Sequence, residues 1–140
     1  MKQVKVTRDI AAPPETVWAI LTDPAQLVAL ETGITSLEGE IGEGSTFRLM
    51  AEASGTRAFK IRVSGFEPPR RMEWSSGAKP MFHGVRVFAL TPVPGGTRLE
   101  MTETFTGLML PLIWRSMPDL TPTFERFAAA VAGQAERKAA

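Results

Sequence analysis

Apolar residues recur at every third or fourth position in the C-terminal part of the chain, with charged and amide side chains between them. This spacing predicts one long amphipathic helix that buries one side. Pro118 and Pro122 lack an N–H group and would disrupt the interior of a helix. We therefore expect regular helix from about Thr121 to Lys138, with a kink or separate turn before it and a cap from Ser116 or Thr121. The apolar stripe comprises Met117, Leu120, Phe124, Phe127, Val131 and Ala135.

The N-terminal part predicts one strand followed by two short helices. Residues 2–10 alternate between polar and mostly apolar side chains, which is the period-two pattern of a strand. Prolines are tolerated in the first turn of a helix, so the apolar stripe after Pro13 and Pro14 predicts a helix that ends at Asp23. A second short helix should end near Gly33, because glycine adopts the left-handed conformation common at helix ends.

From residue 34 the chain changes to short alternating runs separated by glycine and proline, which predicts strands joined by turns. We expect one strand at 34–41 and then a hairpin with a three-residue turn at 54–56. This turn and the alternation together predict a register in which Ala51 faces Phe59 and Leu49 faces Ile61.

The last predicted hairpin places two charges on an apolar face. It follows a strand with Met72 and Trp74 and an expected loop at 75–80. A turn centred on 94–96 would align the two strands of the hairpin. The predicted pairs are Leu90 with Leu99, Phe88 with Met101, and Arg86 with Glu103. Both charged side chains of the last pair would point inward.

The order of these elements, seven strands with helices after the first strand and at the end, predicts an α+β fold. The chain has 140 residues, of which 44% are hydrophobic and 22% are charged. This composition fits a single domain over residues 1–140 with a core of ordinary size. No internal repeat or linker divides it.

Charge and cysteine content exclude several classes of function. The net charge of +1 and the absence of a basic run argue against a nucleic-acid partner. With no cysteine and one histidine, neither a disulfide nor a transition-metal site is expected, and no cofactor is implied. The N-terminus lacks the apolar run of a signal peptide, and no segment is long enough to cross a bilayer. We expect a cytoplasmic protein without stable membrane insertion, either a monomer or a homodimer.

Three motifs resemble a known superfamily in their order and spacing. They are the segment 10–18, the hairpin motif from Phe88 through Pro92 to Leu99, and Phe105-x-Gly107 followed by the terminal helix. Together they resemble the START-like superfamily, also called SRPBCC, and more closely its polyketide cyclase/dehydratase-like bacterial members. The resemblance implies the helix-grip fold, in which a curved seven-stranded antiparallel sheet wraps around a long C-terminal helix. It also implies a cavity that binds hydrophobic small molecules in many members.

Arg86 and Glu103 are the first candidates for function. A charge removed from water costs several kcal/mol unless it is paired and hydrogen-bonded. Two inward charges therefore indicate a structural ion pair, a polar group that orients a ligand, or acid/base catalysis by Glu103. Arg8 on the first strand is expected within reach of Glu103. An arginine at this place can hold a carbonyl, phenolate or carboxylate with its planar donor group.

Large apolar side chains on the same faces are either plain core or the lining of a ligand cavity. Because His83 alternates with Arg86 along its strand, we expect it to point outward. The candidate ligand-binding residues are Arg86, Glu103, Trp74, Phe59, Phe88, Met101, Phe105, Met117 and Phe124.

A dense apolar run at 108–114 precedes the terminal helix. It is too short to cross a bilayer. Buried packing is the simplest interpretation, and a cavity mouth, a dimer contact or a transient membrane contact are the others.

The function we expect is binding of a small hydrophobic ligand, whether lipid, aromatic or polyketide-like. One alternative is a cyclase or dehydratase in which Arg86 and Glu103 polarise the substrate or move protons. The other is a protein-binding module like the co-chaperones of this superfamily, with a filled interior and an active outer surface.

Overall fold

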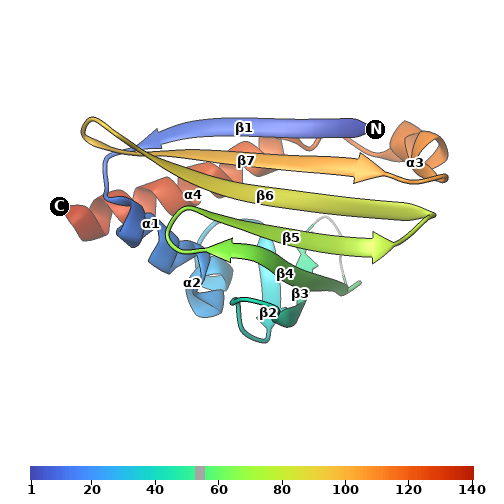
Figure 1. Ribbon diagram of the computed structural model, residues 1–140, viewed down its shortest axis with the longest axis horizontal. Coiled ribbons are helices and arrows are strands. Elements are labelled where there is room, and N and C mark those ends of the chain that lie inside the picture. The colour runs from blue at the N-terminus through green and yellow to red at the C-terminus, as the bar shows by residue number, and fades with distance from the viewer. Residues whose placement is uncertain (53–55) are drawn as a thin grey trace.

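An antiparallel sheet forms one layer of the molecule, and a long helix crosses its face (Figure 1). The computed structural model describes residues 1–52 and 56–140. The strands are β1 (Lys2–Ile10), β2 (Ile34–Glu38), β3 (Thr46–Ala51), β4 (Phe59–Glu67), β5 (Arg71–Ala78), β6 (Phe82–Val93) and β7 (Gly96–Thr106). The helices are α1 (Pro14–Leu21), α2 (Pro24–Ala29), α3 (Leu110–Ser116) and α4 (Thr121–Ala139).

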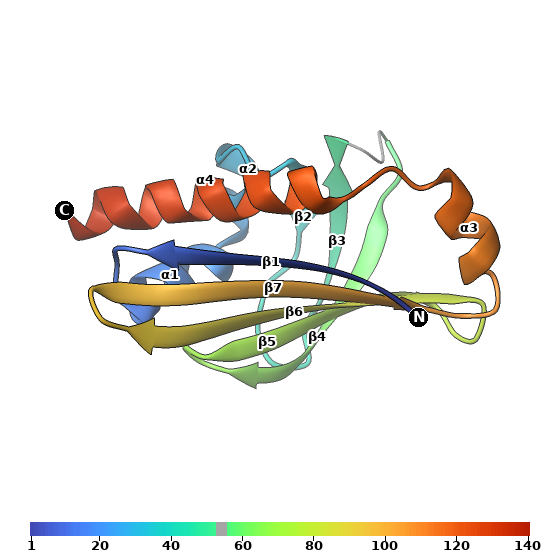
Figure 2. The same cartoon turned by 90° about the horizontal axis from the view of Figure 1, so that it is seen from above.

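The sheet formed by the described residues has the strand order β1-β7-β6-β5-β4-β3-β2. Seen from above, α4 lies over the sheet, and β3 and β4 curl upward beyond it (Figure 2). Helices α1 and α2 lie toward one end of the sheet and α3 lies at the other. The predicted α+β helix-grip architecture is therefore confirmed, including the two short helices after the first strand.

The first strand agrees with the sequence, but its register separates Arg8 from Glu103. β1 pairs with β7 so that Val4 lies opposite Glu103 and Arg8 lies opposite Leu99. Four residues along a strand correspond to about 13 Å. The expected contact between Arg8 and Glu103 is therefore wrong, and the Arg8 side chain is exposed.

The predicted β3–β4 register is wrong by two residues. Phe47 pairs with Ile61 and Leu49 pairs with Phe59. The same residues still share a face, because a shift by two preserves the alternation of a strand. The predicted turn at 54–56 lies partly outside the described residues.

Three expected boundaries also differ. The second short helix ends at Ala29 and not near Gly33. β2 ends at Glu38, three residues before the predicted end at Ile41. β5 continues to Ala78, so most of the segment predicted as a loop at 75–80 is strand. Its residues Ser75 to Ala78 pair with Val85 to Phe82 of β6, and this pairing compensates for their low strand propensity.

The β6–β7 hairpin has the predicted register. Leu90 faces Leu99, Phe88 faces Met101 and Arg86 faces Glu103. The connection is a tight turn at Pro94 and Gly95, and Gly95 has a positive φ of 84°. Glycine adopts this backbone conformation without steric cost.

The C-terminal segment forms two helices, and α4 begins at Thr121 as predicted. Neither Ser116 nor Thr121 caps it with a side chain. The backbone N–H of Thr121 instead donates to the Asp119 carboxylate at 3.0 Å. Helix α4 buries one face against the sheet and α1, and its buried residues are Phe124, Phe127, Ala128, Val131, Ala132 and Ala135.

Candidate functional site

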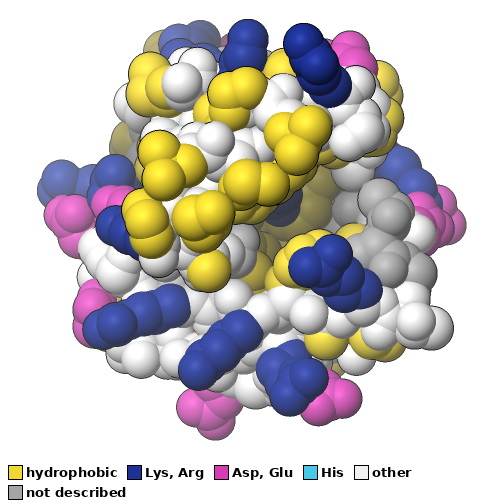
Figure 3. Space-filling model, turned by 90° about the vertical axis from the view of Figure 1, so that its right-hand side faces the viewer, with side chains coloured by type: hydrophobic (Ala, Val, Ile, Leu, Met, Phe, Trp, Pro, Cys, Tyr) yellow, Lys and Arg dark blue, Asp and Glu magenta, His cyan; other side chains and the backbone are white. Residues whose placement is uncertain are grey.

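A cavity of about 550 Å³ lies between the curved sheet and the first half of α4. Its opening is visible as a hollow in the end of the molecule near α3 (Figure 3). The lining is mostly apolar, which is typical of sites for small molecules. It comprises Thr32, Gly33, Ile34, Leu49, Ala51, Arg57, Phe59, Ile61, Trp74, Ser76, Phe82, Arg86, Glu103, Phe105, Met117, Pro118, Leu120, Thr123, Phe124 and Phe127.

Arg86 and Glu103 form an ion pair in the wall of this cavity. The Arg86 Nε–H donates to Glu103 Oε1 at 2.7 Å. Their side chains retain only 23% and 13% of their exposure, so the pair is largely removed from water. The Arg86 guanidinium also lies 4.4 Å from the centre of the Phe124 ring. A carboxylate on β7 and an aromatic ring on α4 therefore fix the plane of the guanidinium.

Strand register places three polar side chains of the wall in one row across neighbouring strands. Trp74 of β5 lies opposite Arg86 of β6, and Arg86 lies opposite Glu103 of β7. Side chains of directly paired residues stand on the same face about 5 Å apart. The three strands therefore present an indole, a guanidinium and a carboxylate side by side.

Gly84 gives the Glu103 carboxylate room. A Cβ at position 84 would lie 3.2 Å from Glu103 Oε2 and 3.5 Å from two carbons of the Phe105 ring. Gly84 has no left-handed backbone conformation, so its small size matters here rather than its flexibility.

Three donor groups in this row, on two side chains, have no acceptor among the described residues. Trp74 is only 3% exposed, and its Nε1 is buried without a hydrogen-bond partner. Arg86 uses Nε for Glu103, and its two Nη groups make no hydrogen bond within the described part of the chain. A buried unpaired donor such as Trp74 Nε1 is costly. Together with the unpaired Nη groups of Arg86, it favours a ligand that carries an oxygen acceptor.

Seven of the nine candidate residues from the sequence lie in the cavity lining: Arg86, Glu103, Trp74, Phe59, Phe105, Met117 and Phe124. The structure places the other two, Phe88 and Met101, in the core, where both are fully buried. Phe88 packs between Trp74, at 4.7 Å between ring centres, and Phe127, at 5.8 Å. Phe88 therefore packs in the core against two side chains that line the cavity.

Thirteen of the twenty lining residues were not among the candidates from the sequence. Ser76 was missed because its segment was expected to be a loop, whereas β5 places it two residues beyond Trp74 on the same face. Alternation along β6 predicts that Phe82 shares a face with Arg86, but Phe82 was not named as a candidate ligand-binding residue. Nothing in the pattern identified Thr32 and Gly33, which reach the cavity from the segment between α2 and β2.

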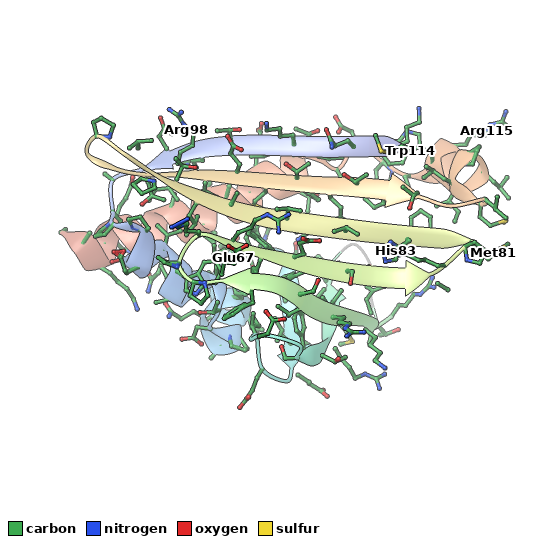
Figure 4. All side chains as sticks on the ribbon, viewed as in Figure 1. Glu67, Met81, His83, Arg98, Trp114 and Arg115 are labelled. Atoms are coloured by element: carbon green, nitrogen blue, oxygen red, sulfur yellow. The ribbon has the colours of Figure 1, made fainter. Side chains whose placement is uncertain are left out.

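His83 does not line the cavity, in agreement with the expected outward direction. It lies near the α3 end of the sheet, on the strand that also carries Arg86 (Figure 4). Burial lowers the pKa of the His83 imidazole below its usual range, and the charge of Lys79 lowers it further. The neutral imidazole is therefore favoured in the folded protein.

The apolar run before α4 is buried only in part. Leu110 is 5% exposed, whereas Leu108 and Leu112 are 74% and 62% exposed. Trp114 packs on Phe105, with 5.5 Å between the ring centres. Buried packing, the simplest interpretation of the run, is therefore correct for Leu110 and wrong for Leu108 and Leu112.

The curved sheet, the helix across it and the cavity between them define a helix-grip protein of the START-like class. The sequence profile of the family described as "Polyketide cyclase / dehydrase and lipid transport" matches residues 1–139. The chain belongs to this family. A comparison with curated proteins found no significant match.

Solved structures with the same fold come from several bacteria. A protein from Mesorhizobium loti has a TM-score of 0.77 at 22% identity, over 97% of this chain and 98% of that chain. A protein from Rhodobacter sphaeroides has a TM-score of 0.74 at 26% identity, over 94% and 90%. The Zhui aromatase/cyclase from a Streptomyces species has a TM-score of 0.77 at 20% identity, over 98% and 94%.

Family and fold together support hydrophobic ligand binding. Within the described ranges, 1–52 and 56–140, no helix has the length and apolar character needed to span a membrane.

Proposed function

We propose that the protein binds one amphipathic small molecule, with a lipid-like, aromatic or polyketide-like body in the cavity and an oxygen-bearing head at Arg86. The observation that carries this proposal is the cavity of about 550 Å³ with the Arg86–Glu103 ion pair in its mostly apolar wall. Pockets of this size and lining bury most of a small ligand and orient it with a few polar groups.

The guanidinium is arranged as an anchor. Its Nε is occupied by Glu103 and its plane is held against Phe124, so the two Nη groups remain for a ligand. A planar pair of donors binds a carboxylate, phenolate or carbonyl oxygen with defined geometry. Trp74 Nε1, one strand away, is a further unpaired donor, and it reaches a ligand if the buried indole turns toward the cavity.

The strongest competing explanation is that the ion pair only stabilises the fold. A partly buried ion pair is weak support for stability, because desolvation offsets most of the attraction between the charges. By this reasoning, replacing Arg86 and Glu103 together with methionine should cost little in the free energy of unfolding, whereas a pair that stabilises the fold would make the replacement costly. Ligand affinity is what separates the two explanations.

The test uses two probes that share one aromatic ring system. Anilinonaphthalene sulfonate carries an anionic head, and phenylnaphthylamine has the same rings without it. Arg86→Met should weaken binding of the sulfonate about 10- to 100-fold, because a hydrogen bond to a charged group is lost. Binding of phenylnaphthylamine should change by no more than about threefold, since the apolar walls are kept. Fluorescence titration measures both affinities.

Glu103→Gln is the matched control for the first variant. It keeps the shape of the pair and all donors of Arg86, so the sulfonate should bind at least as tightly as in the unchanged protein. The double variant Arg86→Met/Glu103→Met removes any unpaired charge from the wall and guards against a folding defect. Equal loss of both probes in Arg86→Met, or no loss of either in a folded variant, would reject Arg86 as the anchor.

An enzymatic use of the same cavity is the second candidate. The observation that favours it is Glu103 Oε2, which makes no hydrogen bond to the described residues and lies in the space left by Gly84. A carboxylate held in place by Arg86 can accept a proton from a bound carbonyl compound. Turnover of a poly-β-ketone that Glu103→Gln abolishes while the substrate still binds would support catalysis. Unchanged turnover in this variant would exclude Glu103.

A further inference from the structure

Large apolar side chains on the surface gather at one end of the molecule. Among the described residues, Leu108, Leu112 and Met81 are 74%, 62% and 45% exposed. The backbone N–H of Met109 donates to the Met81 carbonyl at 2.8 Å, which holds the β5–β6 turn against the segment before α3. Leu108 lies just before α3, and Leu112 lies in its first turn. We call Met81, Leu108 and Leu112 the α3 patch.

The α3 patch borders the mouth of the cavity. Phe82, directly after Met81, lines the cavity, as do Met117 and Pro118, which connect α3 to α4. Figure 3 shows hydrophobic side chains gathered beside the hollow, and Figure 4 places Met81, Trp114 and Arg115 at the same end of the molecule. Exposed apolar patches mark sites that contact proteins, membranes or ligands. A patch at the cavity entrance is therefore suited to contact the source of a hydrophobic ligand.

The two segments that carry the patch contain basic residues and no acidic ones. The segments 75–85 and 106–117, which carry the patch, contain Lys79 and Arg115 and no Asp or Glu. Lys2 lies 6.0 Å from the centre of the Trp114 ring. Figure 3 shows Lys and Arg side chains around the hollow, with Asp and Glu side chains farther out at the edges of the same face. The net charge of the whole chain is only +1, so this end is more basic than the molecule as a whole.

We propose that the α3 patch and its basic border dock the protein on the surface of an anionic lipid bilayer, with the cavity mouth facing the lipid. Exposed leucine and methionine side chains enter the boundary between headgroups and acyl chains, and Lys79 and Arg115 lie among anionic headgroups. This arrangement brings a membrane-dissolved ligand to the cavity without a membrane-spanning segment.

Charge complementarity favours a bilayer over a second copy of the chain. In a two-fold symmetric dimer the same patch meets itself. Lys79 and Arg115 of one copy would then face the same cations of the other, which is unfavourable in a desolvated interface. An anionic lipid surface matches both the apolar patch and its basic border.

The experiment is flotation of the full chain with two kinds of vesicle, pure phosphatidylcholine and an equimolar mixture of phosphatidylcholine and phosphatidylglycerol. The protein should float with the anionic vesicles, and added salt should release it. Leu108→Ser/Leu112→Ser and Lys79→Glu/Arg115→Glu should each lower the partition coefficient about tenfold or more.

The matched control reverses two charges at the opposite end. Arg137→Glu/Lys138→Glu makes the same change in net charge at the C-terminal end of α4, far from the patch (Figure 1). Its partition coefficient should stay within about twofold of that of the unchanged protein if docking is local. Absence of binding to anionic vesicles, or an equal loss in the control variant, would overturn the proposal.

Two further measurements distinguish membrane docking from a defect in the ligand site and from dimer formation through the patch. Phenylnaphthylamine binding without vesicles should be unchanged in both patch variants, so a failure of docking is separable from a failure of the ligand site. Sedimentation velocity should show the same oligomeric state for the unchanged protein and for Leu108→Ser/Leu112→Ser. A dimer in the unchanged protein that is lost in Leu108→Ser/Leu112→Ser would assign the patch to a second copy of the chain and overturn membrane docking.

Discussion

Gly107 shows how one residue sets the position of a whole element. Its φ is 129°, and a Cβ there would lie 2.3 Å from the Met81 carbonyl oxygen. The chain turns at this glycine from β7 toward α3 and passes directly over the backbone of the β5–β6 turn. Any larger residue would displace α3 from the cavity mouth.

Gly107→Ala should therefore lower the free energy of unfolding by about 1–3 kcal/mol, through backbone strain and the clash with Met81. Gly42→Ala is the control, because nothing lies within 4 Å of a Cβ there and its φ is not positive. Urea unfolding should place the Gly42 variant within about 0.5 kcal/mol of the unchanged protein. Equal effects of the two substitutions would contradict this role of Gly107.

His83 predicts a pH dependence of stability. Its pKa is lowered in the folded protein, so the unfolded chain binds a proton more readily as the pH falls below about 6.5. Stability should thus decrease from pH 7.5 to about 5.5, and His83→Gln should reduce this decrease. Asp9 and Glu52 also have lowered pKa values, through hydrogen bonds from Arg98 and Arg126, but they act only at more acidic pH. Thermal unfolding at several pH values measures the difference; parallel curves for the two proteins would count against His83.

At the scale of elements, the sequence predicted which residues share a face better than which residues pair. The β6–β7 register was predicted correctly because Pro94 and Gly95 specify a tight turn that fixes it. In β3–β4, pairing Leu49 with Phe59 or with Ile61 places the same side chains inward. Alternation distinguishes the two faces of a strand and cannot distinguish shifts by two residues.

Small residues determine how closely α4 approaches its neighbours. Ala128, Ala132 and Ala135 are buried on the face that contacts β1 and α1. Ala132→Leu should cost about 1–3 kcal/mol of stability, because a well-packed interface resists added volume. Ala139→Leu, an exposed position at the end of the same helix, should be nearly neutral. A stable Ala132 variant in chemical denaturation would show that this contact is loose.

At the scale of the whole molecule, the fold followed from the order of its elements and its motifs, whereas the extent of the cavity did not. Phe88 and Phe105 lie on the same kind of apolar strand face, yet only Phe105 borders empty space. That difference depends on how far the sheet curves away from α4 along its length, which is a property of the assembled fold. The sequence around either residue therefore cannot predict which of the two borders the cavity.

The most direct test of the account is to fill the cavity. Ser76 lies in the lining, whereas its neighbour Ser75 does not and donates a hydrogen bond to the Arg62 carbonyl. The unchanged protein and Ser75→Phe should each bind one equivalent of phenylnaphthylamine, and Ser76→Phe should bind it about tenfold more weakly or not at all. If a folded Ser76→Phe protein binds the probe as tightly as the unchanged protein, the space between sheet and helix is not the ligand site.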